Sequence, residues 1–339
     1  MSAPPIPTFN RRTLLATAGV VAALVAAPVI VPSATAASHA SEISLADHQA
    51  RLKSAAVADG TVRYLDLGPA DGRAVMLLHG IPTSSYLWRH VAPVLAERGY
   101  RVLAPDVLGA GASDKPKGAG IYSSDKQAER LFAVADAAGV ETFVPVLHDV
   151  GGMIGWEMVI ADPARLDGLV ATNTLIELNG VTPSPTVMTI MGGQATPDAV
   201  FGKLDDPVFA TQATREWLDQ GWVGSPAPDA LVEAYAADLR DGGAAPYAAF
   251  FSEVVPRFMS TGEQRTEALS KFGKPTAIVF GERDGFFDAD TVIPDLQAAL
   301  GTPDANVTRI PDAGHFTPER TPDALVAAID AFMKTLPAN

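Results

Sequence analysis

The chain contains no cysteine among its 339 residues, so disulfide bonds and thiolate metal sites are excluded. Positive charge is scarce as well, since 25 lysines and arginines face 39 aspartates and glutamates and give a formal net charge of −14. This balance argues against nucleic acid or an anionic membrane surface as a partner. No pair of histidines has metal-ligand spacing with a carboxylate, and no phosphate-binding loop is present. We therefore expect neither a metal nor a cofactor.

The N-terminal region has the pattern of an export signal. An Arg11-Arg12 pair precedes an apolar stretch from Ala16 to Val31, and Ala34-Thr35-Ala36 supplies the small residues of a signal peptidase site. We predict that residues 1–36 are a twin-arginine signal peptide, and that the protein works in the periplasm or outside the cell. Removing two arginines and no acidic residue brings the net charge to −16. The alternative is a single membrane anchor, because the stretch is nearly long enough to span a bilayer.

The rest of the chain has the rhythm of a layered α/β fold. Apolar runs alternate with helical patterns over residues 61–172, and the pattern resumes at Pro275–Phe280 and Asn306–Ile310. This predicts a mostly parallel, doubly wound sheet with its ligand site at the carboxyl ends of the strands. Residues 176–257 show helical patches without strands, which predicts an inserted helical cap over a core formed by 37–175 and 258–339. Residues 37–60 are expected to be a short helical lead-in.

The segment from Val144 to Gly152 carries the chemistry. An apolar run stops at His148-Asp149, two glycines follow, and a buried helix is expected from Met153. Strand, sharp turn and helix with a reactive residue at the apex form a nucleophile elbow, whose usual sequence is G-x-S-x-G. Here the apex residue is Asp149, which directs the chemistry towards carbon–halogen bonds or epoxides and away from ordinary ester cleavage.

Two further residues complete a catalytic triad. Asp284 follows the strand that ends at Phe280, and His315 follows the last strand, so nucleophile, acid and base occur in the order of the α/β-hydrolase fold. An ionised Asp149 can displace a leaving group from saturated carbon and form an alkyl–enzyme ester. His315, oriented by Asp284, then activates the water that hydrolyses this ester.

The backbone N–H groups of Ile81 and Val150 are expected to form the oxyanion hole. His79, Gly80 and Pro82 shape the turn that carries Ile81. Alternation along the strand points His148 away from Asp149, so we expect it to be a structural hydrogen-bonding residue.

On these residues, the sequence resembles the haloalkane dehalogenases, the branch of α/β-hydrolases with an aspartate nucleophile that is shared with epoxide hydrolases. The similarity includes the segment His79 to Arg89, the segment Asp106 to Pro116 and the HD-x-GG elbow, and it extends over nearly the whole mature chain. The resemblance implies a small apolar organic substrate and water as partners, and an acid placed after the seventh strand, here Asp284.

Two positions depart from that family. Val150 stands where the family normally has the tryptophan that binds the departing halide, and Ile81 stands where one branch has a halide-binding asparagine. Trp217 or Trp222 of the cap are candidates to compensate. An epoxide would instead need an acid, and the resemblance makes Tyr235 and Tyr247 of the cap candidates for it. The favoured interpretation is a dehalogenase-like hydrolase; an epoxide hydrolase and a non-catalytic small-molecule binder are the alternatives.

Overall fold

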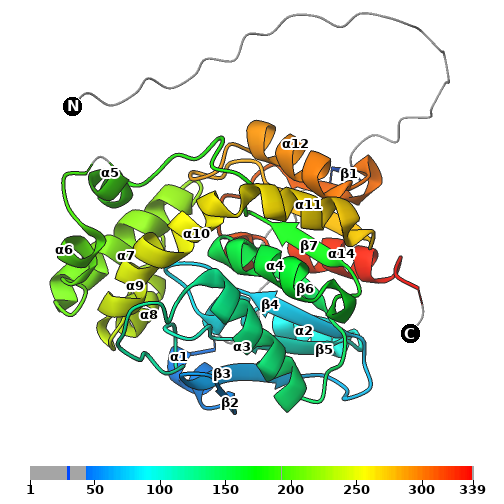
Figure 1. Cartoon of the computed structure of the whole chain (residues 1–339), viewed down its shortest axis with the longest axis horizontal. Coiled ribbons are helices and arrows are strands. Elements are labelled where there is room, and N and C mark those ends of the chain that lie inside the picture. Colours follow the sequence, from blue (N-terminus) through cyan, green and yellow to red (C-terminus); the bar gives the residue numbers. More distant parts are fainter. Residues whose placement is uncertain (1–28, 31–42, 192, 338–339) are drawn as a thin grey trace, which may run out of the picture.

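The computed structural model describes residues 29–30, 43–191 and 193–337, and Figure 1 shows a central sheet with helices on both faces. The sheet has nine strands in the order β1-β9-β8-β7-β6-β4-β5-β3-β2. All neighbouring strands from β1 to β5 in this order are parallel, whereas β3 pairs antiparallel with β5 and β2 antiparallel with β3. The strands are β1 (Val29–Ile30), β2 (Lys53–Val57), β3 (Gly60–Leu67), β4 (Ala74–Leu78), β5 (Arg101–Pro105), β6 (Val144–His148), β7 (Leu169–Thr172), β8 (Thr276–Gly281) and β9 (Val307–Ile310).

The central strands explain why their sequences are continuous apolar runs. Every residue of β4, β6, β7 and β8 is buried, because helices cover both faces of a parallel sheet. One face packs against α3 (Ser124–Ala137), α4 (Val150–Ala161), α11 (Gly262–Phe272) and α12 (Ala289–Leu300). The other face packs against α2 (Ala92–Glu97) and α14 (Pro322–Met333). The predicted α/β-hydrolase fold is confirmed.

The described part of the segment between β7 and β8 contains helices and no strand, and the helices before α11 form a cap beside the sheet (Figure 1). Its aromatic side chains Phe201, Trp217 and Tyr247 build a small core of their own. The predicted cap boundary at residue 257 falls inside α10. The cap elements are α5 (Pro185–Met191), α6 (Pro197–Phe201), α7 (Pro207–Gly221), α8 (Asp229–Arg240), α9 (Ala244–Ala249), the π-helical turn η3 (Phe250–Val254) and α10 (Val255–Ser260).

The N-terminal part differs from the sequence expectation. In its described part, residues 43–60, the predicted helical lead-in contains only one short helix, α1 (Leu45–Gln49), and then β2, which forms the edge of the sheet. Buried and exposed side chains do not alternate regularly along β2, because Ala55 is the one buried residue of this strand. The predicted signal peptide lies outside the described residues except for Val29–Ile30, which pair with β9. Among the described residues, none of the helices combines the length and the apolar character needed to span a membrane.

The remaining short elements connect strands to helices. Residues 84–98 form the 3₁₀ turn η1 (Ser85–Trp88) and α2. The others are η2 (Pro163–Arg165), η4 (Asp304–Asn306) and α13 (Thr317–Arg320).

A buried ion pair attaches the cap to the core. Arg89, just after η1, lies 2.6 Å from Glu319 of α13, and the two side chains are 3% and 2% exposed. The hydroxyl of Tyr235 on cap helix α8 donates to the same Glu319 oxygen at 2.6 Å. Burying a carboxylate is costly unless it is paired and hydrogen-bonded, so these three side chains depend on one another.

Replacing Arg89 with methionine should strongly destabilise the protein. The change leaves the buried Glu319 carboxylate without its cation, which typically costs about 3–5 kcal/mol. Lys271→Met is the matched control, because Lys271 and its partner Glu267 are 70% and 66% exposed and such pairs contribute about 1 kcal/mol or less. Urea denaturation measures both, and equal losses of stability in the two variants would contradict the prediction.

Candidate active site

Asp149 occupies the apex of a sharp turn between β6, which ends at His148, and α4, which begins at Val150. Its backbone has φ 52° and ψ −124°, a conformation that non-glycine residues rarely adopt and that costs on the order of 1–3 kcal/mol. A Cβ on Gly151 would lie 2.8 Å from the backbone oxygens of Leu78 and His79, so only glycine fits where α4 passes β4. The turn is therefore an elbow that exposes one carboxylate.

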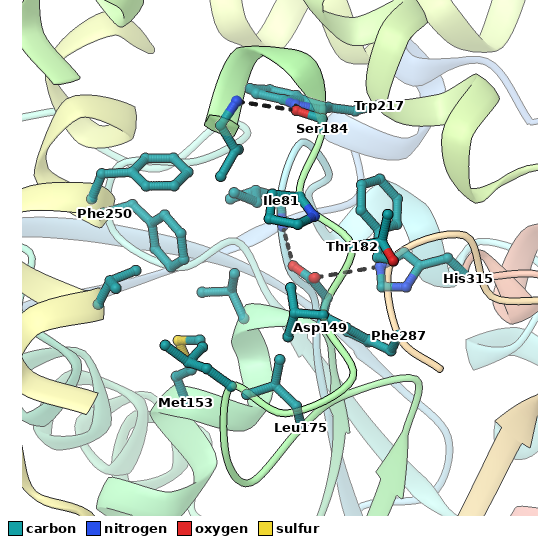
Figure 2. Close-up of a pocket in the computed structure, with 18 of the residues that line it drawn as sticks. Ile81, Asp149, Met153, Leu175, Thr182, Ser184, Trp217, Phe250, Phe287 and His315 are labelled. Atoms are coloured by element: carbon teal, nitrogen blue, oxygen red, sulfur yellow. Dashed lines mark hydrogen bonds and ion pairs between the residues drawn. The ribbon is translucent and has the colours of Figure 1, made fainter. Parts of the chain in front are cut away.

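The Asp149 carboxylate has a separate partner for each oxygen (Figure 2). Oδ1 accepts a hydrogen bond from the Ile81 backbone N–H at 3.0 Å, and Oδ2 lies 3.4 Å from Nε2 of His315. Burial alone would raise the pKa of Asp149, but the hydrogen bond and charge of His315, with a backbone bond from Val150, hold it below its usual value. The carboxylate is thus ionised at neutral pH.

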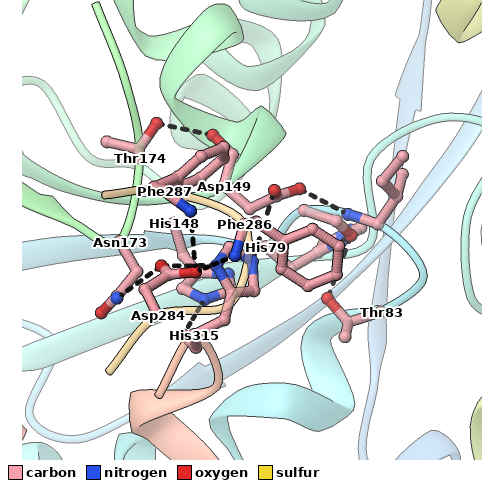
Figure 3. Close-up of polar contacts among 12 residues, drawn as sticks. His79, Thr83, His148, Asp149, Asn173, Thr174, Asp284, Phe286, Phe287 and His315 are labelled. Atoms are coloured by element: carbon pink, nitrogen blue, oxygen red, sulfur yellow. Dashed lines mark hydrogen bonds and ion pairs between the residues drawn. The ribbon is translucent and has the colours of Figure 1, made fainter. Parts of the chain in front are cut away.

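His315 lies between two carboxylates. Its Nδ1 is 2.9 Å from Oδ2 of Asp284, and both side chains are almost completely buried. Burial opposes protonation, but Asp284 and Asp149 outweigh it and raise the pKa of His315 to about 10. Oδ1 of Asp284 accepts from the backbone N–H groups of Phe286 at 2.8 Å and Phe287 at 3.1 Å. The structure brings the three predicted triad residues together (Figure 3).

Asn173 is a residue of this site whose role the sequence did not reveal. It follows β7, is fully buried and has a positive φ of 41°. Its Nδ2 donates to Oδ2 of Asp284 at 2.9 Å, while its Oδ1 accepts from the Gly281 N–H at 3.2 Å and from the Thr317 hydroxyl at 3.2 Å. Asn173 therefore positions the acid of the triad. The one feature of the sequence that could have pointed to this role is the position of Asn173 at the end of a strand.

Two buried histidines support the turns on either side of Asp149. His79 accepts from the Val107 N–H at Nε2, and its Nδ1 lies 2.8 Å from the Gly80 carbonyl, which fixes the Ile81 loop. His148 Nε2 lies 3.0 Å from the carbonyl oxygen of His315, and burial lowers the pKa of His148 to about 4. His148 is therefore neutral and holds the His315 loop from behind.

A cavity of about 430 Å³ opens onto Asp149 and His315. Apolar side chains from the core, the cap and the loop after β8 form most of its wall, among them Ile81, Val150, Met153, Phe250, Phe286 and Val255. Thr182, Ser184 and Trp217 are the other lining residues with polar side-chain atoms. In size and character it suits a small apolar molecule.

Only one of the four predicted pocket residues lines this cavity. Trp217 does so, but its indole N–H donates to the Ser184 hydroxyl at 3.0 Å. Tyr247 stacks on Trp217, with ring centroids 5.8 Å apart, and lines a smaller neighbouring cavity of about 60 Å³.

The two other predicted pocket residues point elsewhere, which corrects the sequence expectation. Tyr235 is fully buried against Glu319, and Trp222 packs on Phe316 with the Arg320 guanidinium over its ring. Both belong to the packing between cap and core. Helical spacing shows that a side chain faces inward but does not show which partner it meets there.

Comparison with known proteins agrees with this geometry. The family model described as alpha/beta hydrolase fold matches residues 73–320. The chain belongs to the α/β-hydrolase fold family. A cis-3-alkyl-4-alkyloxetan-2-one decarboxylase of Xanthomonas campestris pv. campestris is 32% identical over 288 residues, covering 81% of this chain and 92% of that protein. A haloalkane dehalogenase of Mycobacterium marinum is 30% identical over 266 residues, covering 76% and 84%.

Among solved structures, the haloalkane dehalogenase DbeA of Bradyrhizobium elkani aligns with a TM-score of 0.67 at 20% identity, covering 84% of this chain and 97% of that one. This similarity supports the fold. The family model and the dehalogenase relative together show that this chain is an enzyme, a haloalkane dehalogenase-like α/β-hydrolase.

Removing the charge of Asp149 should lower the pKa of His315. In Asp149→Asn the neighbour on Nε2 becomes neutral, so less negative charge stabilises the imidazolium. NMR titration of the His315 imidazole measures the change, with Asp312→Asn, two residues past β9 and two before Gly314, as a control that keeps both carboxylate partners. An unchanged titration of His315 in Asp149→Asn would show that Asp149 does not govern the charge of this base.

Proposed function

We propose that the protein hydrolyses a small apolar substrate through an ester on Asp149, with dehalogenation of a haloalkane as the favoured reaction. The observation that carries this proposal is the geometry of one carboxylate, held by the Ile81 N–H on Oδ1 and facing His315 on Oδ2 inside an apolar cavity. Such a carboxylate is ionised, oriented and shielded from bulk water, as a nucleophile at saturated carbon must be.

The first step is a displacement at carbon. Oδ2 of Asp149 attacks, the bond to the leaving group breaks with its electron pair, and an alkyl ester forms. The ester carbonyl oxygen is then Oδ1, already bound by the Ile81 N–H. A single oxyanion donor of this kind contributes about 10²- to 10³-fold to the rate.

The second step depends on the charge of His315. Esterification makes Asp149 neutral and removes one of the two groups that keep the imidazole protonated. His315 can then lose its proton, take one from water and direct that water onto the ester carbonyl carbon. Asp284, held by Asn173 and by two backbone N–H groups, orients the imidazole throughout. General-base assistance contributes about 10²- to 10⁴-fold.

The wall of the cavity favours leaving groups that need no proton. No tyrosine is among the residues that line it, and Tyr235 donates its hydroxyl to Glu319. In the absence of a tyrosine, an epoxide would leave as an alkoxide that needs the protonated His315 as its acid, whereas a halide leaves as a stable anion. The geometry thus weighs against the epoxide alternative. An ordered triad in an open cavity weighs against the non-catalytic binder, which has no use for it.

A four-membered lactone is a second candidate substrate, favoured by the relative that is named an oxetan-2-one decarboxylase and is 32% identical. An Asp149 oxygen would attack the saturated ring carbon that is bonded to the ring oxygen. The bond between that carbon and the ring oxygen would break and release a carboxylate, so this step again needs no acid. Loss of carbon dioxide, with the electron pair forming an alkene and the Asp149 oxygen departing, would regenerate the enzyme. Val150, which offers no side-chain donor to a halide, is compatible with this route.

Replacing His315 with alanine should trap the ester. Displacement by Asp149 remains possible, but hydrolysis loses its base, so intact-mass spectrometry should show a covalent adduct with an accepted bromoalkane. Asp149→Asn is the matched control and should show none. Assays of halide, of diol from styrene oxide, and of carbon dioxide from a cis-dialkyl oxetan-2-one identify the substrate. An active wild-type enzyme whose His315→Ala variant forms no adduct would contradict the covalent route.

A further inference from the structure

The polar atoms of the active-site cavity are grouped at two separate places. Asp149 and His315 form the reacting group, with Thr182 beside them. Ser184 with Trp217 lies apart across the cavity, and Ile81 lies between the two groups in the view of Figure 2. Most of the other lining side chains are apolar, among them Ile81, Phe250 and Phe251. The catalytic steps make no use of the second group.

The hydroxyl of Ser184 accepts two hydrogen bonds, but its own proton has no acceptor among the described residues. Its hydroxyl oxygen accepts from the Trp217 indole N–H at 3.0 Å and from the Val187 backbone N–H at 3.3 Å. A hydroxyl has two acceptor lone pairs and one proton, so both lone pairs are used and donation is what remains. No described residue is recorded as accepting from it, although Ser184 is only 1% exposed and lines the cavity.

We propose that Ser184 is a substrate-binding residue that donates a hydrogen bond to a neutral oxygen acceptor carried by the substrate, away from its reacting carbon. A buried donor without an acceptor is costly, so a ligand oxygen at this place gains more than it would at an exposed hydroxyl. Two accepted hydrogen bonds polarise the hydroxyl and strengthen its donation. Trp217 is then a positioning residue, which acts on the substrate through Ser184.

The cavity also defines the chemical class of this acceptor. Asp149 places a negative charge in it, and the lining residues include no lysine or arginine that would neutralise a carboxylate. Aliphatic and aromatic side chains surround the rest of the substrate. The inferred substrate is an apolar chain or ring with a leaving group at one end and a carbonyl or ether oxygen at the other. This inference rests on the proposed function only for the identity of the reacting end.

The test uses the full chain and two measurements. Calorimetry records binding of methyl ketones from 2-pentanone to 2-nonanone, which needs no turnover. Halide release then gives kcat/KM for bromoalkanes and for bromoalkyl methyl ketones of the same lengths. Ser184→Ala should weaken binding of the best-bound ketone and lower kcat/KM for its bromoketone by about three- to tenfold, with a smaller loss for the bromoalkane. Ser184→Thr, which keeps the hydroxyl, should retain both.

The controls separate this role from general packing. Thr189→Val removes a hydroxyl from α5, the helix that follows Ser184. This hydroxyl donates to the Pro185 carbonyl, and the variant should bind the ketones and turn over the bromoketones like the wild type. Trp217→Phe should reduce the preference for ketones in the same direction as Ser184→Ala. If Ser184→Ala does not fold, Ser184→Cys replaces it, because a thiol is a weak donor.

Each result has a defined meaning. Equal ketone binding by the wild type and Ser184→Ala, or equal losses for bromoalkane and bromoketone, would overturn the proposal. If no bromide is hydrolysed but ketone binding still depends on the Ser184 hydroxyl, the dehalogenase proposal fails and the assignment of Ser184 stands.

Discussion

The structure depends on holding one ionised carboxylate inside an apolar cavity. An unpaired buried charge would be prohibitively costly, so the fold supplies the Ile81 N–H to one Asp149 oxygen and an imidazolium to the other. Asp284 stabilises that imidazolium, and Asn173 and two backbone N–H groups stabilise Asp284. Ile81, Asn173, Asp284 and His315 follow the carboxyl ends of four different strands. The parallel sheet therefore positions the groups that stabilise the buried Asp149 carboxylate. It also holds the strained backbone of Asp149 in place.

The cap is attached by the same principle of compensated burial. Tyr235 reaches from α8 to Glu319, which Arg89 neutralises, and the aromatic cluster of Trp217, Tyr247 and Phe201 stabilises the cap from within. These contacts fix the wall that faces Asp149, so the cap shapes the substrate cavity without contributing a charged group to its lining. The polar residues that join the cap to the core lie outside the cavity lining, and most of that lining is apolar.

The sequence predicted those parts of the site that local patterns determine. Asp149, Asp284 and His315 each follow an apolar run, and the carboxyl ends of neighbouring parallel strands necessarily meet at one edge. Helical periodicity in the cap could not distinguish a side chain that faces the substrate from one that faces the core, so Trp222 and Tyr235 were assigned to the cavity although they pack on Phe316 and Glu319. The role of Asn173 could not be predicted, because it lies in contacts with residues more than a hundred positions away. The edge strand β2 was missed because most of its residues are solvent-facing.

Val150 changes what the cavity can recognise. A tryptophan directly after the nucleophile would place an indole N–H beside the leaving group, whereas valine offers only apolar surface there. The indole N–H that the cavity wall does contain, that of Trp217, is bound to Ser184 and cannot serve an anion at the same time. The ease with which the leaving group departs then depends on how stable that group is as a free anion. The hydroxyl of Ser184 adds hydrogen-bonding capacity away from the reacting carbon. Selectivity in this enzyme is thus expected to come from the body of the substrate more than from its leaving group.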